Sequence, residues 1–393
     1  MTLLYLVHSC PYPPHKGDRI RSFHVLRHLA KRYDIKLVYP SFSSDDIRHA
    51  EELRKYCISV HTVQLNRFFA KLRCALGIFT NKSFTSCYFY SHAIHSLIKD
   101  MKFDIALVDC SSMASYMIDS HKPKIIDFVD VDYDKWRMYA EKAFFPKSII
   151  YSMEYNKLKD FEIEINRIFD HSIVISEDER KLLPDTLKVS VVSNGIDVQD
   201  VRSEGEYVKN SLIFIGAMNY FANVDGVLYF HEKVLPLIKS QVDDIQFIIA
   251  GMHPVKKIRK LESQDVVVTG YVPDIRSYIA RAAVCVVPLR IAKGIQNKVL
   301  EAMAMGVPVV ATPAANRGIG AQDKKEIMLA DNPSDFAKAT VALLQEAGLR
   351  QEITTNARQF VLKHFDWETN LKKLDDIIAH LSPAAARETL GVG

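Results

Sequence analysis

The sequence lacks a large excess of charge of either sign. Its 393 residues include 51 Lys and Arg against 47 Asp and Glu, which gives a formal net charge of +4. A nucleic-acid-binding domain usually carries a strongly basic balance or a basic patch, so this composition does not favour a nucleic-acid partner. Any electrostatic role of the protein is therefore expected to depend on a few local residues.

The cysteines lack the spacing of a metal site or of a disulfide framework, because no two of them form a CxxC pair. The six cysteines are Cys10, Cys57, Cys74, Cys87, Cys110 and Cys285. In a chain of this length, scattered cysteines are typical of reduced and mostly buried thiols.

The N-terminal part of the sequence has only a short apolar run. Five apolar residues extend from Leu3 to Val7, and no basic residue precedes them. Such a run is too short for a signal peptide or a membrane span, so it predicts a first buried strand. The sequence also has no evident internal repeat or low-complexity tract. These features favour a cytoplasmic protein.

Short runs of Val, Ile and Leu alternate with longer amphipathic stretches along the whole chain. The runs cover residues 3–8, 35–39, 104–109, 124–130, 171–176 and 188–193, and then 211–218, 245–252, 265–272, 284–289, 307–312 and 326–331. Apolar runs without strict alternation fit strands that are covered on both faces. Two successive series, in a chain too long for one core, predict an α/β protein with two doubly wound, Rossmann-like domains that face a cleft.

The predicted domains are residues 1–205 and 206–365. The polar stretch 197–210 is interpreted as a linker, and residues 366–393 as a C-terminal helix and tail that return to the first domain. In doubly wound sheets, ligands bind outside the carboxyl ends of the strands. That rule selects seven loops, namely 8–18, 109–116, 130–137, 216–226, 251–254, 270–274 and 288–300.

The last of these loops, between a predicted strand and a predicted helix, has the composition of a phosphate and ribose site. Its polar residues are Arg290, Lys293, Gln296, Asn297 and Lys298, with Gly294 among them and Glu301 one turn into the helix. A helix N-terminus offers unpaired N–H groups to a phosphate, and a carboxylate can accept from two vicinal hydroxyls. The alternative is an exposed helix start whose charged side chains are only solvated.

Several stretches carry a family resemblance. "KVLEAMAMGVPVVAT" (298–312) closely resembles the donor-site signature of the GT-B glycosyltransferases of family 4, and "VSNGID" (192–197) and "FIGAMNYFANVDGVLYF" (214–230) resemble other parts of that pattern. "KGDRIRSFHVLRHLA" (16–30) and "DFVDVDYDKWRMYA" (127–140) resemble the subgroup associated with exosortase, or PEP-CTERM, extracellular polysaccharide loci.

The resemblance implies a retaining glycosyltransferase that uses no metal or other cofactor. Its donor would be a nucleotide sugar bound by the second domain, with UDP or GDP as the expected nucleotide. Its acceptor would be a glycan or a lipid-linked glycan bound by the first domain. Glu301 would hold the ribose, Tyr271 and Val272 would contact the base, and Gly216 would face the diphosphate. Backbone N–H groups of Gly294 and Ile295 would contact the donor, as would Gly17 of the first domain.

The sequence departs from the family pattern at three points. Lys293 replaces the first of two usual glutamates, residues 217–224 lack the usual cations, and the stretch 108–116 lacks the usual histidine. A diphosphate still needs positive charge. We therefore predict that Lys293 or Lys298, helped by Arg290, supplies that charge from another loop. Asp109, at the strand end without the histidine, is the third catalytic candidate.

The stretch "DVDYD" (130–134) contains a DxD motif, which is the signature of metal-dependent transferases of another fold. So short a motif is weak evidence for a metal. We favour an acceptor-facing loop formed by Asp130, Asp132, Lys135 and Trp136. The histidines His8, His15 and His253 lack ligand spacing and are interpreted as structural.

Residues 66–79 interleave basic and apolar residues. They predict either a peripheral contact with an anionic membrane or an ordinary amphipathic helix packed on the first domain. Two other functions remain open for the whole chain. One is a sugar-nucleotide 2-epimerase of the same fold, and the other is a non-catalytic sugar-nucleotide-binding subunit.

Overall fold

The computed structural model describes residues 1–14, 17–184, 188–196 and 207–382. These residues divide into two compact units. Unit 1 comprises Met1–Ser193 together with Glu368–Gly393, and unit 2 comprises Asn194–Trp367. The predicted domain boundary at residue 205 and most of the predicted linker, 197–210, lie outside the described residues. The acceptor-binding and donor-binding roles of the two domains remain predictions.

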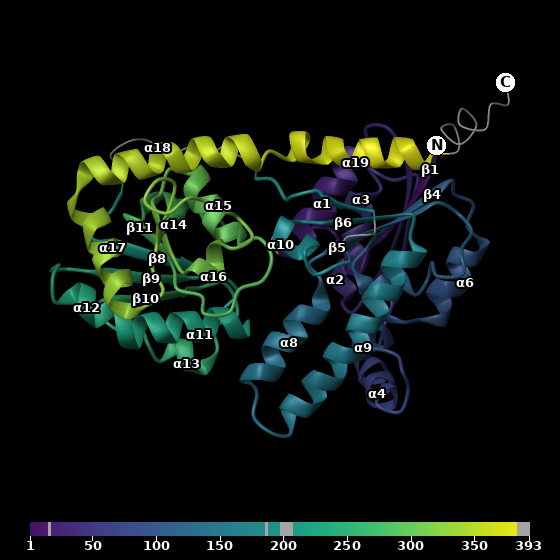
Figure 1. Cartoon of the computed structure of the whole chain (residues 1–393), viewed down its shortest axis with the longest axis horizontal. Helices are drawn as coiled ribbons and strands as arrows, with labels where there is room; N and C mark the ends of the chain where they lie inside the picture. The colour runs from purple at the N-terminus through teal and green to yellow at the C-terminus, as the bar shows by residue number, and fades with distance from the viewer. Residues whose placement is uncertain (15–16, 185–187, 197–206, 383–393) are drawn as a thin grey trace. The chain divides into compact units, whose positions relative to one another are not determined.

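Unit 1 contains a parallel seven-stranded sheet with strand order β3-β2-β1-β4-β5-β6-β7. Its strands are β1 (Thr2–Leu6), β2 (Asp34–Ser41), β3 (Ser59–Gln64), β4 (Ile105–Asp109), β5 (Lys124–Val129), β6 (His171–Val174) and β7 (Val189–Val191). Its helices are α1 (Gly17–Leu29), α2 (Ser44–Arg48), α3 (Ala50–Leu53), α4 (Arg67–Gly77), α5 (Phe84–Phe89), α6 (His92–Asp100), α7 (Ser111–Ala114), α8 (Asp132–Lys142), α9 (Lys147–Ile168), α10 (Glu177–Arg180) and α19 (Trp367–Leu381). Figure 1 labels most of these elements along the chain.

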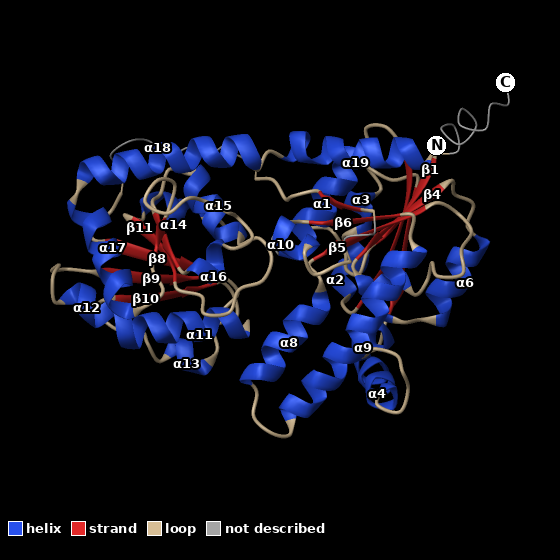
Figure 2. Ribbon diagram, viewed as in Figure 1, coloured by secondary structure: helices blue, strands red, loops and turns tan. Residues whose placement is uncertain are grey.

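Unit 2 contains a parallel six-stranded sheet with strand order β10-β9-β8-β11-β12-β13. Its strands are β8 (Ser211–Ile215), β9 (Gln246–Ala250), β10 (Val266–Gly270), β11 (Val284–Val287), β12 (Val309–Ala311) and β13 (Met328–Leu329). Its helices are α11 (Phe221–Tyr229), the π-helix η1 (Phe230–Val234), α12 (Leu235–Lys239), α13 (Lys256–Arg259), α14 (Arg276–Arg281), α15 (Asn297–Ala304), α16 (Pro313–Asn316), α17 (Pro333–Gln345) and α18 (Ala347–His364). Within each unit, helices cover the sheet (Figure 2).

The central strands are buried because both faces of each sheet are covered. Every residue of β4, β8 and β11 is buried, which explains why their sequences are apolar without alternation. Edge strand β3 was missed by the sequence analysis. Its sequence, SVHTVQ, contains only two apolar residues, and its side chains are at most half-buried.

Helix α19 belongs to unit 1, which confirms the prediction that the C-terminal helix returns to the first domain. Asp375 of α19 lies 2.9 Å from Nε2 of His28 and 2.7 Å from a guanidinium nitrogen of Arg32. Both partners belong to the part of the chain that follows β1, so these contacts join sequence segments more than 340 residues apart. The predicted fold class, α/β with two doubly wound sheets, is thus confirmed.

Candidate functional site

The loop between β11 and α15 is held by its own backbone and by a neighbouring glycine. Gly294 has a φ of +60°, a conformation that glycine adopts without strain. A Cβ atom at Gly318 would lie 2.7 Å from the carbonyl carbon of Gly294 and would overlap its oxygen. Gln296, the N-cap residue of α15, donates through Nε2 to the carbonyl of Lys293 at 2.8 Å. The loop conformation therefore depends on close backbone packing.

Lys298 extends from the first turn of α15 to the first turn of α11, directly after the loop that follows β8. Its Nζ donates to Oδ1 of Asn223 at 2.7 Å and lies 4.6 Å from the ring centre of Phe214. Asn223 is buried and donates through Nδ2 to the carbonyl of Ala217 at 3.0 Å. Residues 217–224 contain no cation of their own, so Lys298 brings an ammonium group to a loop that lacks one.

Glu301 lies one turn beyond Lys298 on the same helix. Burial raises the pKa of its carboxyl to about 7, against the opposing effects of Arg276 and Lys298. Burial also lowers the pKa of the Lys298 ammonium to about 8, although Cys285 and Glu301 act in the opposite direction. Perturbed titratable groups at a strand-end loop are typical of functional sites. A carboxylate and an ammonium on one helix can together bind hydroxyls and phosphate.

Two further glycines shape the same edge of the unit 2 sheet. A Cβ atom at Gly216 would lie 2.5 Å from Nδ2 of Asn223, and one at Gly251 would overlap the backbone of Gly216. Glycine at these positions lets the loops after β8 and β9 approach each other closely. The predicted diphosphate-facing residue, Gly216, therefore lies next to the side chain that holds Lys298.

The other predicted donor-binding residues are distributed around this edge. Arg290 pairs through two nitrogens with the carboxylate of Asp225, at 2.5 and 3.0 Å, and stacks over the ring of Tyr229. The side chain of Tyr271, directly after β10, is exposed and that of Val272 is half-buried, whereas the side chain of Ile295 is buried. Oδ1 of Asn297, the first residue of α15, is buried and has no hydrogen-bond partner in the part of the chain that the structure describes.

In unit 1, the pairing of β1 with β4 brings Asp109 and His8 together. Asp109 is buried, and its Oδ2 accepts a hydrogen bond of 2.7 Å from the hydroxyl of Ser22. Nδ1 of His8 lies 3.5 Å from the same oxygen. The sequence analysis interpreted His8 as structural, and nothing in the local sequence links it to a residue 101 positions later. Gly17, the predicted first-domain glycine, is the first residue of α1. His15 lies outside the described residues.

The backbone is strained at the ends of β4 and β5. Cys110 has a φ of +67° and Val129 a φ of +61°, which is a genuine outlier for a β-branched residue. Such strain is maintained only where surrounding packing enforces it, and it is concentrated at functional loops. The two strained residues flank the predicted loops 109–116 and 130–137, so both loops are tightly constrained.

Most of the predicted loop 130–137 belongs to helix α8, which begins at Asp132. Two buried carboxylates accept hydrogen bonds from its backbone: Glu179 from the N–H of Val131, and Glu162 from the N–H groups of Asp132 and Tyr133. Asp132 forms an ion pair with Lys135.

The remaining side chains of this loop also contact neighbours within unit 1. Asp134 pairs with Arg137 at 2.8 Å, and Trp136 packs against the rings of Tyr139 and Tyr151. Asp130 follows the strained Val129 and also has an interaction partner. The structure therefore brings the predicted acceptor-side residues together at the start of α8. The carboxylates of Glu162 and Glu179 already accept hydrogen bonds from the N–H groups there.

Two groups of side chains among the described residues have metal-ligand geometry. They are His8, Asp109 and Cys110, and Cys10, Asp46 and His49. Burial raises the pKa of both thiols, which disfavours the thiolate that a metal needs. Arg19 also pairs with Asp46 at 3.0 Å. Arg19 therefore competes with any cation for Asp46, and neither group is interpreted as a metal site.

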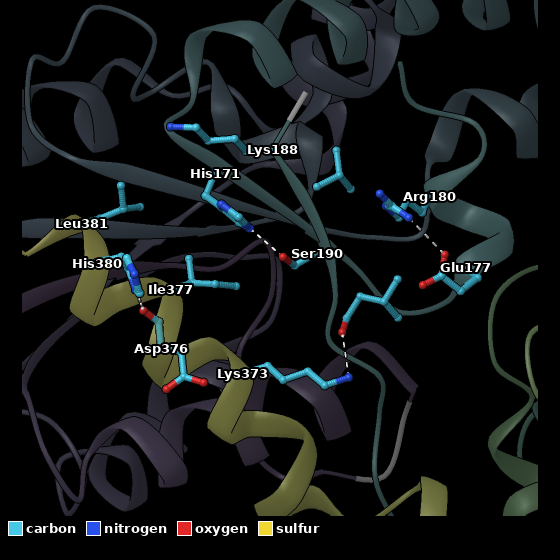
Figure 3. A pocket seen from close by; sticks show the side chains of 12 residues that line it. His171, Glu177, Arg180, Lys188, Ser190, Lys373, Asp376, Ile377, His380 and Leu381 are labelled. Carbon is cyan, nitrogen blue, oxygen red and sulfur yellow. Dashed lines mark hydrogen bonds and ion pairs between the residues drawn. The ribbon is translucent and has the colours of Figure 1, made fainter. Parts of the chain in front are cut away.

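A surface pocket of unit 1 lies along edge strand β7, away from the predicted loops (Figure 3). Its lining includes residues of β7, α10 and α19, and several of them bond to one another. His171 lies 2.9 Å from the hydroxyl of Ser190, and Arg180 pairs with Glu177 at 3.5 Å. Burial lowers the pKa of His171, with a smaller contribution from Lys188. These internal pairs give no indication of a ligand.

Comparisons with known proteins agree with this geometry. Residues 209–346 match the family model described as glycosyl transferases group 1. The chain is 22% identical over 391 residues to an uncharacterized 44.6 kDa protein in the cps region of Klebsiella pneumoniae, covering 91% of this chain and 95% of that protein. It is also 22% identical over 243 residues to an uncharacterized glycosyltransferase of Methanocaldococcus jannaschii. This match covers 57% of this chain and 59% of that protein.

Solved structures with the same fold include sucrose-phosphate synthase from Thermosynechococcus elongatus, with a TM-score of 0.73 and 15% sequence identity. The match covers 97% of this chain and 99% of that chain. Anabaena HepE in complex with UDP and glucose has a TM-score of 0.71 and 13% sequence identity. This match covers 96% of this chain and 99% of that chain. These likenesses show that the two sheets form a GT-B fold. The segment matched by the family model includes Lys298, Glu301 and the loop after β8. Together with the relative named glycosyltransferase, it supports a transferase enzyme.

Proposed function

We propose that the protein transfers a sugar from a nucleotide-sugar donor to a glycan or lipid-linked glycan, with retention of configuration. The group 1 family match over unit 2 supports the transfer reaction. The UDP and glucose bound to HepE support a nucleotide-sugar donor. The cps-region relative supports a role in extracellular polysaccharide synthesis, and the motifs of the first 140 residues support the exosortase-associated subgroup. The cytoplasm is the expected location.

One contact carries this proposal: the ammonium of Lys298 bonded to Asn223 within the cation-free segment 217–224, which forms the loop after β8 and the first turn of α11. A diphosphate held at this loop would need positive charge, because water cannot neutralise it in a closed site. Lys298 supplies that charge from α15. Its lowered pKa reflects a poorly solvated ammonium, whose attraction for an anion is stronger than it would be in water.

Lys298 acts on the leaving group in this mechanism. The bond between the anomeric carbon and the diphosphate oxygen breaks, and the acceptor hydroxyl oxygen forms the new bond from the same face. The diphosphate takes the electron pair of the broken bond, and the acceptor proton passes to it. Charge on the diphosphate grows in the transition state, and a preorganised cation lowers the barrier most there. Lys293, in the loop that precedes the same helix, is the second cation of this site.

Glu301 binds the ribose in this proposal. Its carboxylate can accept hydrogen bonds from both ribose hydroxyls, and Tyr271 and Val272 after β10 contact the base. Gly216, Gly294 and Ile295 contribute backbone N–H groups, and Gln296 and Asn297 add side-chain amides. The unsatisfied, buried oxygen of Asn297 supports this assignment, because an orphaned buried acceptor is expected to find a donor in the bound state.

The acceptor side is assigned to unit 1. Asp109 and His8 lie together there, with 3.5 Å between Nδ1 of His8 and Oδ2 of Asp109. The start of α8, with Asp130, Asp132, Lys135 and Trp136, borders the neighbouring strand end. A double displacement would need a carboxylate at the anomeric carbon. Glu301 is committed to the ribose, so a front-face displacement fits the unit 2 site better.

A thermal-shift panel of UDP-, GDP- and ADP-sugars tests the proposed donor class. A ligand that binds the native state raises the melting temperature in proportion to its affinity and concentration. We expect one nucleotide to stabilise wild type and to lose that effect in Glu301→Ala. Absence of any shift across the panel would contradict the proposal. Epimerised sugar nucleotide formed without an acceptor would identify an epimerase instead, and binding without turnover on any acceptor would identify a binding subunit.

A further inference from the structure

Most of the exposed large apolar side chains of the protein are concentrated in two segments of unit 1. The described residues include nineteen such side chains, and ten of them lie in segments 68–79 and 144–150. These ten are Phe68, Phe69, Leu72, Leu76, Ile78, Phe79, Phe144, Phe145, Ile149 and Ile150. Scattered single apolar residues are normal on a surface, but a contiguous patch marks an interaction site.

The first segment is helix α4 with the turn that follows it. One of the two interpretations of residues 66–79 was an ordinary amphipathic helix packed on the first domain. Most of the large apolar side chains of α4 do not pack on the domain. Phe68, Phe69, Leu72 and Leu76 are all exposed, and Phe79 in the following turn is 87% exposed. Among the described residues, nothing covers this apolar surface.

The second segment connects α8 to α9. The two helices lie side by side as a hairpin (Figure 1), and the connection forms its tip. Phe144 is 91% exposed and Phe145 80% exposed, and the first turn of α9 adds Ile149 and Ile150. The sequence analysis assigned no role to this tip.

The two segments belong to one surface because α9 bonds to the end of α4. Lys157 of α9 donates to the carbonyl groups of Gly77 at 2.8 Å and of Thr80 at 2.6 Å. One turn earlier, Glu154 accepts from the backbone N–H groups of Phe84 and Thr85. Ile150 lies one further turn along α9, about 6 Å away. The exposed Ile150 therefore lies on the face of α9 that bonds to the α4 turn, about 10 Å along the helix from Lys157, and the hairpin tip lies directly before it.

This surface is also basic. Segments 66–83 and 142–153 contain six Lys and Arg residues and no Asp or Glu, in a chain whose net charge is only +4. The cations are Arg67, Lys71, Arg73, Lys82, Lys142 and Lys147. Apolar side chains surrounded by basic ones match an anionic lipid surface, since the apolar groups insert at the acyl boundary while the cations contact the headgroups.

We propose that the α4 surface and the α8–α9 hairpin tip together dock unit 1 on an anionic lipid bilayer. No helix of the described residues is long and apolar enough to cross a membrane, so the contact is peripheral. The positive charge of the six Lys and Arg residues favours an anionic lipid surface over a neutral one. Phe144 and Phe145 at the hairpin tip supply apolar area that the bilayer can bury. This inference stands apart from the proposed transfer reaction, because it predicts binding without substrate.

Vesicle co-sedimentation tests the proposal with the full-length protein. Wild type should sediment with vesicles of equimolar phosphatidylglycerol and phosphatidylcholine at low salt, and much less with phosphatidylcholine alone. The double variant Phe144→Ser/Phe145→Ser should lose most of this binding. Arg67→Glu/Lys71→Glu should lose it as well, and the wild-type binding should weaken as salt is added. Arg73 is left intact because it bonds to the carbonyls of Cys87 and Tyr88.

Matched variants in unit 2 serve as controls. Leu237→Ser/Leu362→Ser removes two exposed apolar side chains, and Lys256→Glu/Lys257→Glu reverses two exposed cations. Both should sediment like wild type, and all variants should keep the wild-type melting temperature and nucleotide-induced shift. The proposal is overturned if wild type stays in the supernatant at low salt, or if the surface variants bind like the controls. A lipid-free dimer that Phe144→Ser/Phe145→Ser dissociates would also overturn it, because the surface would then bind a second copy.

Discussion

Lys298 and Asn223 are joined by a 2.7 Å hydrogen bond that links helix α15 to the first turn of α11, directly after the loop that follows β8. Asn223 is in turn bonded to the backbone of Ala217, so the ammonium has a defined position beside that loop. The family resemblance predicts cations within the loop itself, and the sequence has none there. The contact is therefore the physical basis for expecting that positive charge has moved from one strand-end loop to another.

Removal of the Lys298 ammonium should reduce turnover more than donor binding. We expect Lys298→Met to lower kcat by about 10–100-fold, somewhat less than the loss of an oxyanion-hole donor, because Lys293 remains. KM for the donor should rise by a smaller factor, since the charge that Lys298 stabilises grows mainly in the transition state. Steady-state donor kinetics measure both, with Lys338→Met on the exposed face of α17 as the control.

Lys293 is tested by restoring the glutamate that the family pattern has at this position. Lys293→Glu places a negative charge at the start of α15 and should lower kcat at least as much as Lys293→Ala. If Lys293→Glu and Lys298→Met both retain wild-type kcat, the diphosphate is not held by relocated lysines.

The pH dependence of donor binding follows from the two pKa shifts. Burial raises the Glu301 pKa from 4.5 to about 7 and lowers the Lys298 pKa from 10.5 to about 8. The form with both a carboxylate and an ammonium is therefore most populated between about pH 7 and pH 8. Donor affinity should decrease below this window as Glu301 gains a proton, and above it as Lys298 loses one.

Isothermal titration with a nucleotide sugar measures this profile, since its diphosphate has no group that titrates near neutral pH. Glu301→Gln should remove the acid-side decrease, and Lys298→Met should remove the alkaline-side decrease. The shifts also affect stability. Raised above its unfolded value, the Glu301 pKa lowers stability as pH rises from 4.5 to 7. The depressed Lys298 pKa raises stability as pH rises from 8 to 10.5. A pH-independent donor affinity would exclude both residues from the binding step.

Glu301→Ala tests the ribose contact directly. Loss of charged hydrogen bonds to the two hydroxyls should weaken nucleotide binding by about 1.5–3 kcal/mol, or roughly 10- to 150-fold. The fold should remain intact, because the carboxylate has an unfavourable, poorly solvated environment in the unbound protein. Affinity for the nucleotide and the melting temperature without ligand are the two measurements. Unchanged affinity would remove Glu301 from the site.

The main strands and the donor loop were predictable from sequence because they follow from local patterns. Runs of Val, Ile and Leu predicted every strand of unit 2, and the strand-end rule selected the loop before α15. Edge strand β3 was missed because a half-buried edge tolerates polar residues. The Lys298–Asn223 contact was not predictable, since it depends on the packing of α15 against the loop after β8.

The pair formed by His8 and Asp109 was also missed. The two residues are 101 positions apart in the sequence, and only the register of β1 with β4, in which Leu3 pairs with Ile105, brings their strand ends together. A strand-order prediction that placed β1 beside β4 could have found it. The chemistry of each residue alone gave no signal, because a single histidine is most often structural.

His8 and Asp109 should affect transfer without affecting nucleotide affinity. We expect His8→Ala and Asp109→Asn each to reduce kcat by about 10- to 1,000-fold if they position or activate groups in the reaction. Nucleotide affinity in a thermal-shift titration should stay within about twofold of wild type, because the proposed nucleotide site lies in unit 2. Ser190→Ala, at the hydroxyl bonded to His171 in the β7 pocket, is the matched control in unit 1. Wild-type kcat in both variants would assign the pair a structural role.

Gly318 should control the donor loop through packing alone. A Cβ atom at this position would lie 2.7 Å from the carbonyl carbon of Gly294 and 3.1 Å from the nitrogen of Ile295. In Gly318→Ala, the loop must therefore move, at a cost of about 1–3 kcal/mol for overpacking. Because Gly294 and Ile295 are predicted to present N–H groups to the donor, nucleotide-sugar affinity should fall by tenfold or more, a loss of at least 1.4 kcal/mol.

Gly348→Ala separates this effect from the general effect of adding a methyl group. Gly348 lies in α18, and no atom lies within 4 Å of its added Cβ. Alanine there should raise the free energy of unfolding by about 0.5–1 kcal/mol, because glycine disfavours a helix, and donor affinity should not change. Denaturant melts and isothermal titration of both variants give the comparison. If Gly318→Ala is destabilised but binds donor like wild type, the backbone of Gly294 and Ile295 does not contact the donor, and the binding contribution must come from the side chains of α15.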